Sequence, residues 1–135
     1  EKIFSQSISA AKRLAEKFNM QVVVACSDNI SEEQLYELTE IRSFKIAKGF
    51  TYDLMKHAKF GIIKSGTSTL ESGILSLPMV IVYKTSLVTY LIVKSMVKVN
   101  KIGMANIILG ETVVPELIQG RVNKQEIYNE VSLIL

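Results

Sequence analysis

Residues 60–83 read FGIIKSGTSTLESGILSLPMVIVY. A short apolar run, Phe60–Ile63, opens this stretch, and a second apolar run, Met79–Tyr83, follows Pro78. Short apolar runs bounded by turn residues are typical of strands, and the polar turn and helical segment between them suit a crossover connection. Because a crossover of this kind joins parallel strands, the stretch predicts a strand–helix–strand unit of the α/β class.

The same alternation extends towards the N-terminus. Apolar residues at three- and four-residue steps predict a first helix that ends at Asn19. The run Gln21–Ala25 predicts a strand covered on both faces, and Phe44–Ala47 predicts a second strand. Between these strands, Ser31 and Gln34 have the spacing of a capping box at the start of a short helix. The apolar positions of a further helix are Tyr52, Leu54, Met55 and Ala58.

The last third of the chain is less regular. Ser86–Val99 is apolar and long enough for a helix, and Asn123–Leu135 predicts a closing helix. Ala105–Leu109 fits a helix or a strand equally well. Taken with the alternation before it, the sequence predicts a doubly wound parallel sheet of the Rossmann type, in one domain that spans residues 1–135.

Composition limits the class of protein. The chain has 135 residues, of which 48% are hydrophobic, and its mean hydropathy is +0.26. This apolar character predicts packing against another surface, and we expect the chain to be a fragment of a longer protein. Neither a secretory leader nor an apolar run of about 18 residues occurs, so neither export nor a membrane span is expected.

Few side chains suit metal or thiol chemistry. Cys26 is the only cysteine, so no internal disulfide is expected, and the apolar run before it predicts a buried, inert thiol. His57 is the only histidine, and a lone histidine is a poor candidate for a metal ligand or a catalytic triad. The sequence therefore predicts no metal and no cofactor. The net charge of +3 suits an anionic ligand or membrane, but no basic stripe with interleaved aromatics predicts a nucleic-acid partner.

The turn after Phe60–Ile63 has the clearest chemical signal. In an open parallel sheet, ligands bind at the carboxyl ends of strands, where helix N-termini also point. Here Ser65-Gly66-Thr67-Ser68-Thr69 places one glycine and four hydroxyl groups at a helix start. Accessible N–H groups, short donors and the positive end of the helix dipole suit a phosphate or diphosphate. No Walker lysine follows, so the turn is not an ATPase phosphate loop.

Glu71 lies four residues after Thr67, so both residues share one side of the expected helix. From the first turn of that helix, a carboxylate would accept hydrogen bonds from both hydroxyls of a ribose. An ordinary structural interpretation fits equally well. Glutamate is favoured in first turns, and Thr67 or Ser68 can serve as plain N-caps.

An ordered series of short motifs resembles the lipid-A-disaccharide synthase family. The similarity is close from Phe60 to Gln119 and is limited to the order of elements elsewhere. The matching motifs are Ser65-Gly66-Thr67-Ser68-Thr69-Leu70-Glu71, Leu77-Pro78-Met79-Val80, Tyr83-Lys84, Thr89-Tyr90, Lys94, Val97-Lys98-Val99, Asn106-Ile107 and Val114-Pro115-Glu116-Leu117-Ile118-Gln119. One such motif is a weak signal, whereas the ordered set is specific.

The resemblance implies the C-terminal half of a GT-B glycosyltransferase, whose two α/β halves close on a cleft without a metal in the chemistry. The donor would be UDP-2,3-diacylglucosamine and the acceptor 2,3-diacylglucosamine 1-phosphate (lipid X). The products would be the β-1,6-linked lipid A disaccharide and UDP. The general base belongs to the N-terminal half in this family, so the chain alone is expected to be inactive.

The resemblance also assigns binding roles. The residues expected to hold the diphosphate are Ser65, Gly66, Thr67, Ser68 and Thr69. Glu71 would bind the ribose hydroxyls, and backbone groups around Gly49 and Phe50 the uracil. The residues of a later motif, expected to face the donor or the cleft, are Asn106, Glu116 and Gln119.

Two positions depart from the family pattern. The family usually has an arginine after the glycine of the asparagine motif, where this chain has Glu111. Glu111 places a negative charge where the resemblance implies an arginine that contacts an anion. The family often has an arginine after the tyrosine equivalent to Tyr83, where Lys84 keeps the charge without the bidentate fork.

The segment Ser86–Val99 predicts contacts with a surface. Its apolar residues and lysines suit an anionic bilayer or acyl chains, and equally an interface helix whose lysines reach solvent. The resemblance implies a cytoplasmic protein on the inner membrane of a Gram-negative bacterium, and a homodimer that exchanges C-terminal elements. Helices from about residue 86 are expected to pack on the N-terminal half or on a partner protomer.

Two other functions stay open at this point. Another UDP-sugar GT-B enzyme, or a UDP-N-acetylglucosamine 2-epimerase, also places glycine, hydroxyls and glutamate at such a loop. The ordered match after Pro78 favours the synthase over both. A non-catalytic nucleotide-binding module is the second alternative, because a fold by itself does not establish a function.

Overall fold

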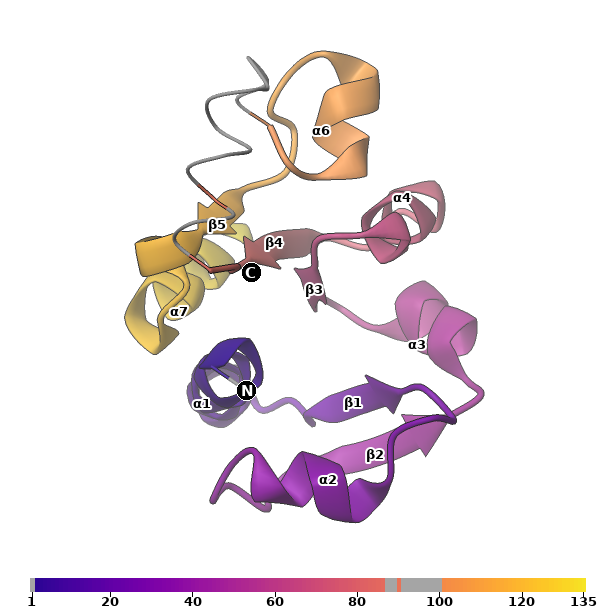
Figure 1. Ribbon diagram of the computed structural model, residues 1–135, viewed down its shortest axis with the longest axis vertical. Helices are drawn as coiled ribbons and strands as arrows, with labels where there is room; N and C mark the ends of the chain where they lie inside the picture. Colours follow the sequence, from indigo (N-terminus) through magenta and orange to yellow (C-terminus); the bar gives the residue numbers. More distant parts are fainter. Residues whose placement is uncertain (1, 87–89, 91–100) are drawn as a thin grey trace.

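The computed structural model describes residues 2–86, 90 and 101–135. The elements in chain order are α1 (Lys2–Phe18), β1 (Val23–Cys26), α2 (Glu32–Glu37), β2 (Lys45–Lys48), α3 (Thr51–His57), β3 (Gly61–Lys64), α4 (Thr67–Ile74), β4 (Met79–Tyr83), α6 (Met104–Leu109), β5 (Glu116–Ile118), the single-turn helix η1 (Gln119–Arg121) and α7 (Lys124–Ile134). Helices and strands alternate, and every strand pair is parallel (Figure 1). The predicted α/β class with parallel strands is confirmed. Most of the helix expected at Ser86–Val99 lies outside the described residues.

The strands form two sheets, whereas the sequence predicts one. β1 pairs with β2, while β3, β4 and β5 form a three-stranded sheet in that order. Strands β2 and β3 begin and end one residue later than expected, and β4 matches its expected bounds. β5 is not among the expected strands, because its residues Glu116–Ile118 belong to a motif that the resemblance assigns to binding.

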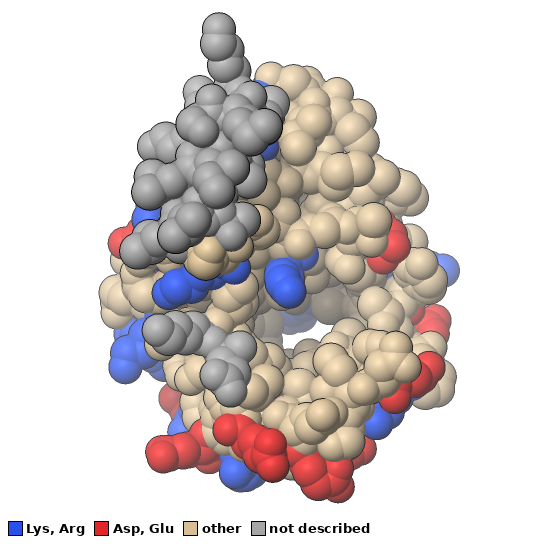
Figure 2. Space-filling view, in the orientation of Figure 1, with Lys and Arg blue, Asp and Glu red and all other residues tan. Residues whose placement is uncertain are grey.

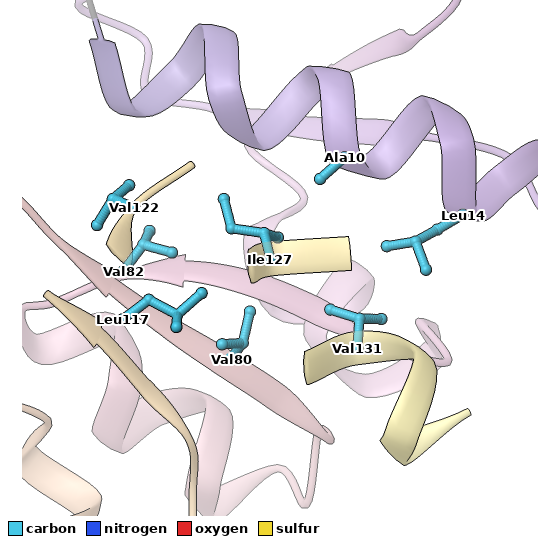
Figure 3. Packing of buried hydrophobic residues seen from close by; sticks show 8 residues of the cluster. All are labelled: Ala10, Leu14, Val80, Val82, Leu117, Val122, Ile127 and Val131. Carbon is cyan, nitrogen blue, oxygen red and sulfur yellow. The ribbon is translucent and has the colours of Figure 1, made fainter. Parts of the chain in front are cut away.

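Strand β4 is the centre of the core. Val80 and Val82 point to one face of the sheet, towards α1 and α7 (Figure 3). Because alternate residues of a strand face opposite sides, Met79 and Ile81 point to the other face, and all four are buried. The residues that pack with Val80 and Val82 are Ala10 and Leu14 of α1, Leu117 of β5, Val122, and Ile127 and Val131 of α7.

Helices α1 and α7 are also joined by polar contacts at their surfaces. Gln6 Oε1 accepts a hydrogen bond from the backbone N–H of Lys124 at 2.9 Å. The guanidinium of Arg13 lies 4.2 Å from the centre of the Tyr128 ring, a cation–π contact. The first and last helices of the chain therefore form one layer over the three-stranded sheet.

Strand β1 is less covered than its sequence predicts. The apolar run Gln21–Ala25 predicts burial on both faces, but Val23 is 37% exposed and Ala25 is also exposed. The prediction of full coverage is wrong because β1 belongs to a two-stranded sheet, in which it has one neighbouring strand. Cys26, at the end of the strand, is buried as expected.

The ends of the helices follow local signals. Asn19 has a left-handed backbone with φ of 50°, and α1 ends just before it. Ser31 and Gln34 form the expected capping box at the start of α2. The pKa of the exposed Glu33 carboxyl is lowered by a hydrogen bond with its own backbone N–H and a second with the Ser31 side chain.

Candidate functional site

The turn from β3 to α4 presents an open helix start. Gly66 precedes α4 as the N-cap residue, and no side chain among the described residues accepts a hydrogen bond from the first N–H groups of the helix. The interpretation of Thr67 or Ser68 as an ordinary side-chain N-cap is therefore wrong. Gly66 is exposed, and a Cβ atom built on it would meet no atom within 4 Å. Within the described residues, the side of Gly66 on which a side chain would project is therefore open to a ligand.

The hydroxyl groups of the turn have two different roles. Ser65 Oγ donates to Ile102 O at 3.1 Å, and the buried Thr69 Oγ1 donates to Gly66 O at 2.8 Å. These two hydroxyls hold the turn together. Thr67 is exposed and Ser68 is half-buried, and within the described residues neither hydroxyl has a hydrogen-bond partner. Thr67 and Ser68 are the hydroxyls that remain available to an anion.

The sequence places Glu71 in the first turn of this helix, but Glu71 is the fifth residue of α4 and lies just beyond that turn. The first turn contains no acidic residue. Favourable interaction with the helix dipole falls off within the first turn, so it gives a weaker explanation of Glu71 than the sequence suggests. Glu71 is half-buried and, at four residues' spacing, lies on the same side of α4 as Thr67. Its contact with a ribose stays a prediction.

A second helix start, that of α6, is closed by side chains. The N–H groups of Ile102 and Gly103 donate to the two carboxylate oxygens of Glu116 at 2.8 and 3.0 Å. The N–H of Met104 donates to Thr69 Oγ1 at 3.2 Å. Residues from α4 and β5 thus occupy the start of α6, in contrast to the open start of α4.

Asn106 completes this network from inside α6. Its Nδ2 donates to Val114 O and to Glu116 Oε1, both at 2.7 Å, and its Oδ1 accepts from the N–H groups of Val113 and Val114, both at 3.0 Å. Four hydrogen bonds fill the capacity of an amide side chain, and Asn106 is fully buried. The structure gives Asn106 and Glu116 a supporting role, and direct contact with a donor sugar stays a prediction for both.

The remaining candidate residues lie apart from this network. Gln119 extends the pairing of β4 and β5, because its side chain accepts from the N–H of Thr85 at 2.8 Å and donates to Thr85 O at 3.2 Å. Gly49 has φ of 74°, and Phe50 is 61% exposed, in the turn between β2 and α3. Gly49 and Phe50 follow a strand of the other sheet, and no hydrogen bond within the described residues joins them to the α4 turn.

Charge and surface shape agree with an open site. In Figure 2 the acidic side chains gather mainly at the end of the molecule where α2 lies. Lys64 is exposed and immediately precedes the α4 turn, while Lys84 is half-buried after β4, and Glu111 is exposed. Two surface hollows are lined by residues of α1, the approach to β2 and the end of α2, away from Gly66. The α4 turn is an open surface, which suits a site shared with a second domain.

The described residues contain neither a membrane-spanning helix nor a cluster of metal-binding side chains. No helix among residues 2–86, 90 and 101–135 is long and apolar enough to cross a membrane. Over the same residues, no three His, Cys, Asp or Glu side chains are grouped so that they could hold a metal ion. His57 is exposed, and its Nδ1 lies 2.8 Å from Asp53 O within α3.

Sequence reasoning misses the segment Ile102–Met104, whose backbone forms hydrogen bonds both with the α4 turn and with Glu116. The available signal is Gly103 directly before the apolar run that begins at Met104. A Cβ atom on Gly103 would lie 2.2 Å from Ile81 Cδ1, so a larger residue here would displace the end of the Ile81 side chain on β4. The glycine therefore marks the place where the start of α6 meets the sheet.

Comparisons with known proteins cover the whole chain. A family model described as lipid-A-disaccharide synthetase matches residues 1–135. A lipid-A-disaccharide synthase of Sulfurihydrogenibium sp. (strain YO3AOP1) is 37% identical over 129 residues, which are 95% of this chain and 31% of the relative. That of Myxococcus xanthus (strain DK1622) is 33% identical over 96% of this chain and 35% of the relative. That of Syntrophus aciditrophicus (strain SB) is 42% identical over 67% of this chain and 24% of the relative.

The chain thus spans about a third of the length of relatives that match nearly all of it. Together with the open α4 turn and the ordered motifs around it, the match over residues 1–135 shows that this chain belongs to the lipid-A-disaccharide synthase family.

Proposed function

We propose that this chain is the nucleotide-sugar half of a glycosyltransferase of lipid A biosynthesis, and that the α4 turn binds the diphosphate of UDP-2,3-diacylglucosamine. The observation that carries the proposal is the contrast between two helix starts. Glu116 and Thr69 accept hydrogen bonds from the N–H groups of Ile102, Gly103 and Met104 at the start of α6, whereas no described side chain accepts from the first N–H groups of α4, and no described atom lies near a Cβ built on Gly66. An uncapped helix start attracts an anion because its N–H groups and dipole are unsatisfied.

In the proposed reaction, a hydroxyl of lipid X attacks the anomeric carbon of the donor sugar. Its proton passes to a general base, for which the N-terminal half is the proposed source. The bond between the anomeric carbon and the diphosphate oxygen breaks, and UDP leaves. The N–H groups at the start of α4, with the hydroxyls of Thr67 and Ser68, would stabilise the negative charge that develops on this leaving group.

The proposed sites for the ribose and the uracil follow from placing the diphosphate at the α4 turn. Glu71 is one turn beyond Thr67 on the same side of α4, so its carboxylate would accept hydrogen bonds from the ribose hydroxyls. The exposed turn of Gly49 and Phe50 would bind the uracil. Family membership supports this assignment over a UDP-N-acetylglucosamine 2-epimerase or a non-catalytic module.

The proposed partners are an N-terminal half, a second copy of the chain and the cytoplasmic face of an anionic inner membrane. Support comes from the apolar side chains that α6 leaves exposed. Ile108 is 60% exposed and Leu109 is 59% exposed, and Ile107 beside them is exposed as well. Such residues suit acyl groups or the boundary of a bilayer.

A matched pair of glycine substitutions tests the diphosphate site. We expect labelled chain titrated with UDP, ADP and GDP to show amide shifts at Gly49–Phe50 and Ser65–Glu71, strongest with UDP. Gly66→Ala should weaken UDP binding by about tenfold or more, because its methyl group would occupy the space in front of the N–H groups. Gly120→Ala is the control, since Gly120 lies in η1 and a Cβ built on it also meets no described atom within 4 Å.

Glu71→Ala tests the ribose contact in the same titration. It should weaken the binding of UDP by about tenfold and the binding of 2′-deoxy-UDP by clearly less, because only the 3′ hydroxyl of that nucleotide remains to bond with Glu71. Equal weakening of both nucleotides would contradict the role of Glu71. Wild-type affinity in Gly66→Ala would contradict the diphosphate site itself.

A further inference from the structure

Strands β1 and β3 face each other with unpaired edges. In the described part of the chain, β1 pairs with β2 alone and β3 with β4 alone. Figure 1 shows no strand between β1 and β3, and Figure 2 shows an opening through the molecule at this place. An unpaired strand edge presents N–H and C=O groups in a row and is a template for a further strand.

The hydrogen bonds of β1 show which of its groups are unpaired. Val22 O accepts from the N–H of Lys45 at 2.9 Å, so Val22 points to β2. In a parallel pair the residues that bond to one neighbour alternate along the strand. The backbone groups of Val23 and Ala25 therefore point away from β2, towards the opening.

The same alternation applies to β3. The N–H groups of Gly61 and Ser65 donate to Pro78 O and Val82 O at 2.9 and 3.0 Å, so these residues point to β4. The backbone groups of Ile62 and Lys64 point the other way, towards β1. Two rows of unpaired backbone groups thus line the opening from both sides.

The side chains of β1 are more apolar than their exposure in the structure would favour. Its apolar run is typical of a strand inside a sheet with neighbours on both edges, yet Val23 and Ala25 are exposed. A neighbouring strand on the free edge would bring its own side chains beside theirs. The exposure of β1 is explained if that neighbour lies outside these 135 residues.

Chain connectivity indicates where the neighbour comes from. Helix α1 leads directly into β1, and a helix of this kind usually joins two parallel strands of one sheet by a right-handed crossover. Because β2 occupies one edge of β1, a strand before α1 would take the other edge, which faces β3. The curated relatives are about three times longer than the matched stretch, so they contain further polypeptide.

We propose that the opening receives one further parallel β-strand, supplied by polypeptide that precedes α1. The two small sheets then become one sheet in the order β2, β1, added strand, β3, β4, β5. This is the order of a doubly wound sheet, whose strand order reverses at the added strand. The loop from that strand to α1 would lie beside the α4 turn, so the binding site is completed by this strand.

Hydrogen exchange compares the 135-residue chain with the full-length polypeptide that contains it. The amides of Val23, Ala25, Ile62 and Lys64 are expected to exchange about a hundredfold more slowly in the full-length protein. The amides of Val24 and Ile63 already point to β2 and β4 and should be slow in both. Equal rates at the four edge amides in the two proteins would overturn the proposal, as would slow exchange of all four in the short chain.

A proline variant gives a second readout. Ala25→Pro removes the N–H group of residue 25 on the free edge of β1. A strand at the edge of a sheet tolerates this loss, whereas a strand with neighbours on both sides does not. The melting temperature should fall much more in the full-length protein than in the short chain, whereas the control Ala25→Gly, which keeps the N–H group, should lower both similarly. Equal effects of Ala25→Pro would contradict the added strand. Both readouts are independent of nucleotide, so their failure leaves the proposed function separately testable.

Discussion

Single residues of the motifs that match the family divide into two kinds, those that support the site and those left available to a ligand. Asn106 has four hydrogen bonds within the chain, and Glu116 accepts three from Ile102, Gly103 and Asn106. Thr67 and Ser68 have no such partners within the described residues. A residue's place in a family motif therefore does not show by itself whether it touches the substrate.

Asn106→Ala should destabilise the chain by about 2–4 kcal/mol, because it removes four hydrogen bonds and leaves Glu116, Val114 O and two backbone N–H groups, which are partly buried, with fewer partners. Urea unfolding followed by circular dichroism measures this loss. Asn129→Ala is a suitable control, since Asn129 is exposed and its side chain accepts a single hydrogen bond, from Gln125. A loss no larger than that of the control would show that the network contributes little.

At the scale of elements, α6 depends on its close approach to β4. A Cβ atom on Gly103 would lie 2.2 Å from Ile81 Cδ1 and 3.1 Å from Glu116 Oε1. Gly103→Ala should therefore lower the stability by about 1–3 kcal/mol through overpacking. Thermal unfolding tests this against Gly73→Ala in α4, where a Cβ would meet, among the described atoms, Ala105 Cβ alone, at 3.8 Å. Equal melting temperatures for the two variants would contradict the tight packing of α6.

The exposed apolar residues of α6, Ile108 and Leu109, lead to a separate prediction about membrane binding. Ile108→Ser with Leu109→Ser should reduce binding to phosphatidylethanolamine–phosphatidylglycerol vesicles by about tenfold, because apolar area that would enter the bilayer is lost. Vesicle sedimentation measures the bound fraction. The control is Ile74→Ser with Leu133→Ser, which removes two exposed apolar side chains from α4 and α7. Equal losses in the two variants would assign the binding to general surface hydrophobicity.

At the scale of the whole molecule, one core joins both ends of the chain. Ala10 and Leu14 near the N-terminus pack with Val80 of β4 and with Ile127 and Val131 near the C-terminus (Figure 3). The chain must therefore close over more than a hundred residues before this core is complete. Truncation at either end is expected to expose the three-stranded sheet.

Ile127→Ala should cost about 2–5 kcal/mol, because the fully buried side chain leaves a cavity between α1, α7 and β4. Against a total stability of about 5–15 kcal/mol, this loss would be visible as a large shift of the urea midpoint. Leu133→Ala, on the same helix but 84% exposed, should change the midpoint little. Similar shifts for both would mean that α7 is not part of the common core.

Much of the fold can be predicted from local patterns. The capping box of Ser31 and Gln34, the end of α1 at Asn19 and the bounds of β4 depend on neighbours within a few residues, and the structure agrees with each. The separate sheets and the exposure of Val23 could not be predicted, because they depend on which strands lie side by side. β5 could not be predicted because it has three residues, of which Leu117 is buried, and too short a pattern to indicate a strand.

The sequence by itself determined the α/β class, the order of the elements and the glycine and hydroxyl turn at Ser65–Thr69, since each depends on local periodicity or on residue type. The tertiary structure alone decided that Thr69 caps a helix 35 residues further along the chain, while the start of α4 stays open. The physical reason is that buried polar groups must find partners, and the fold selects those partners from distant segments.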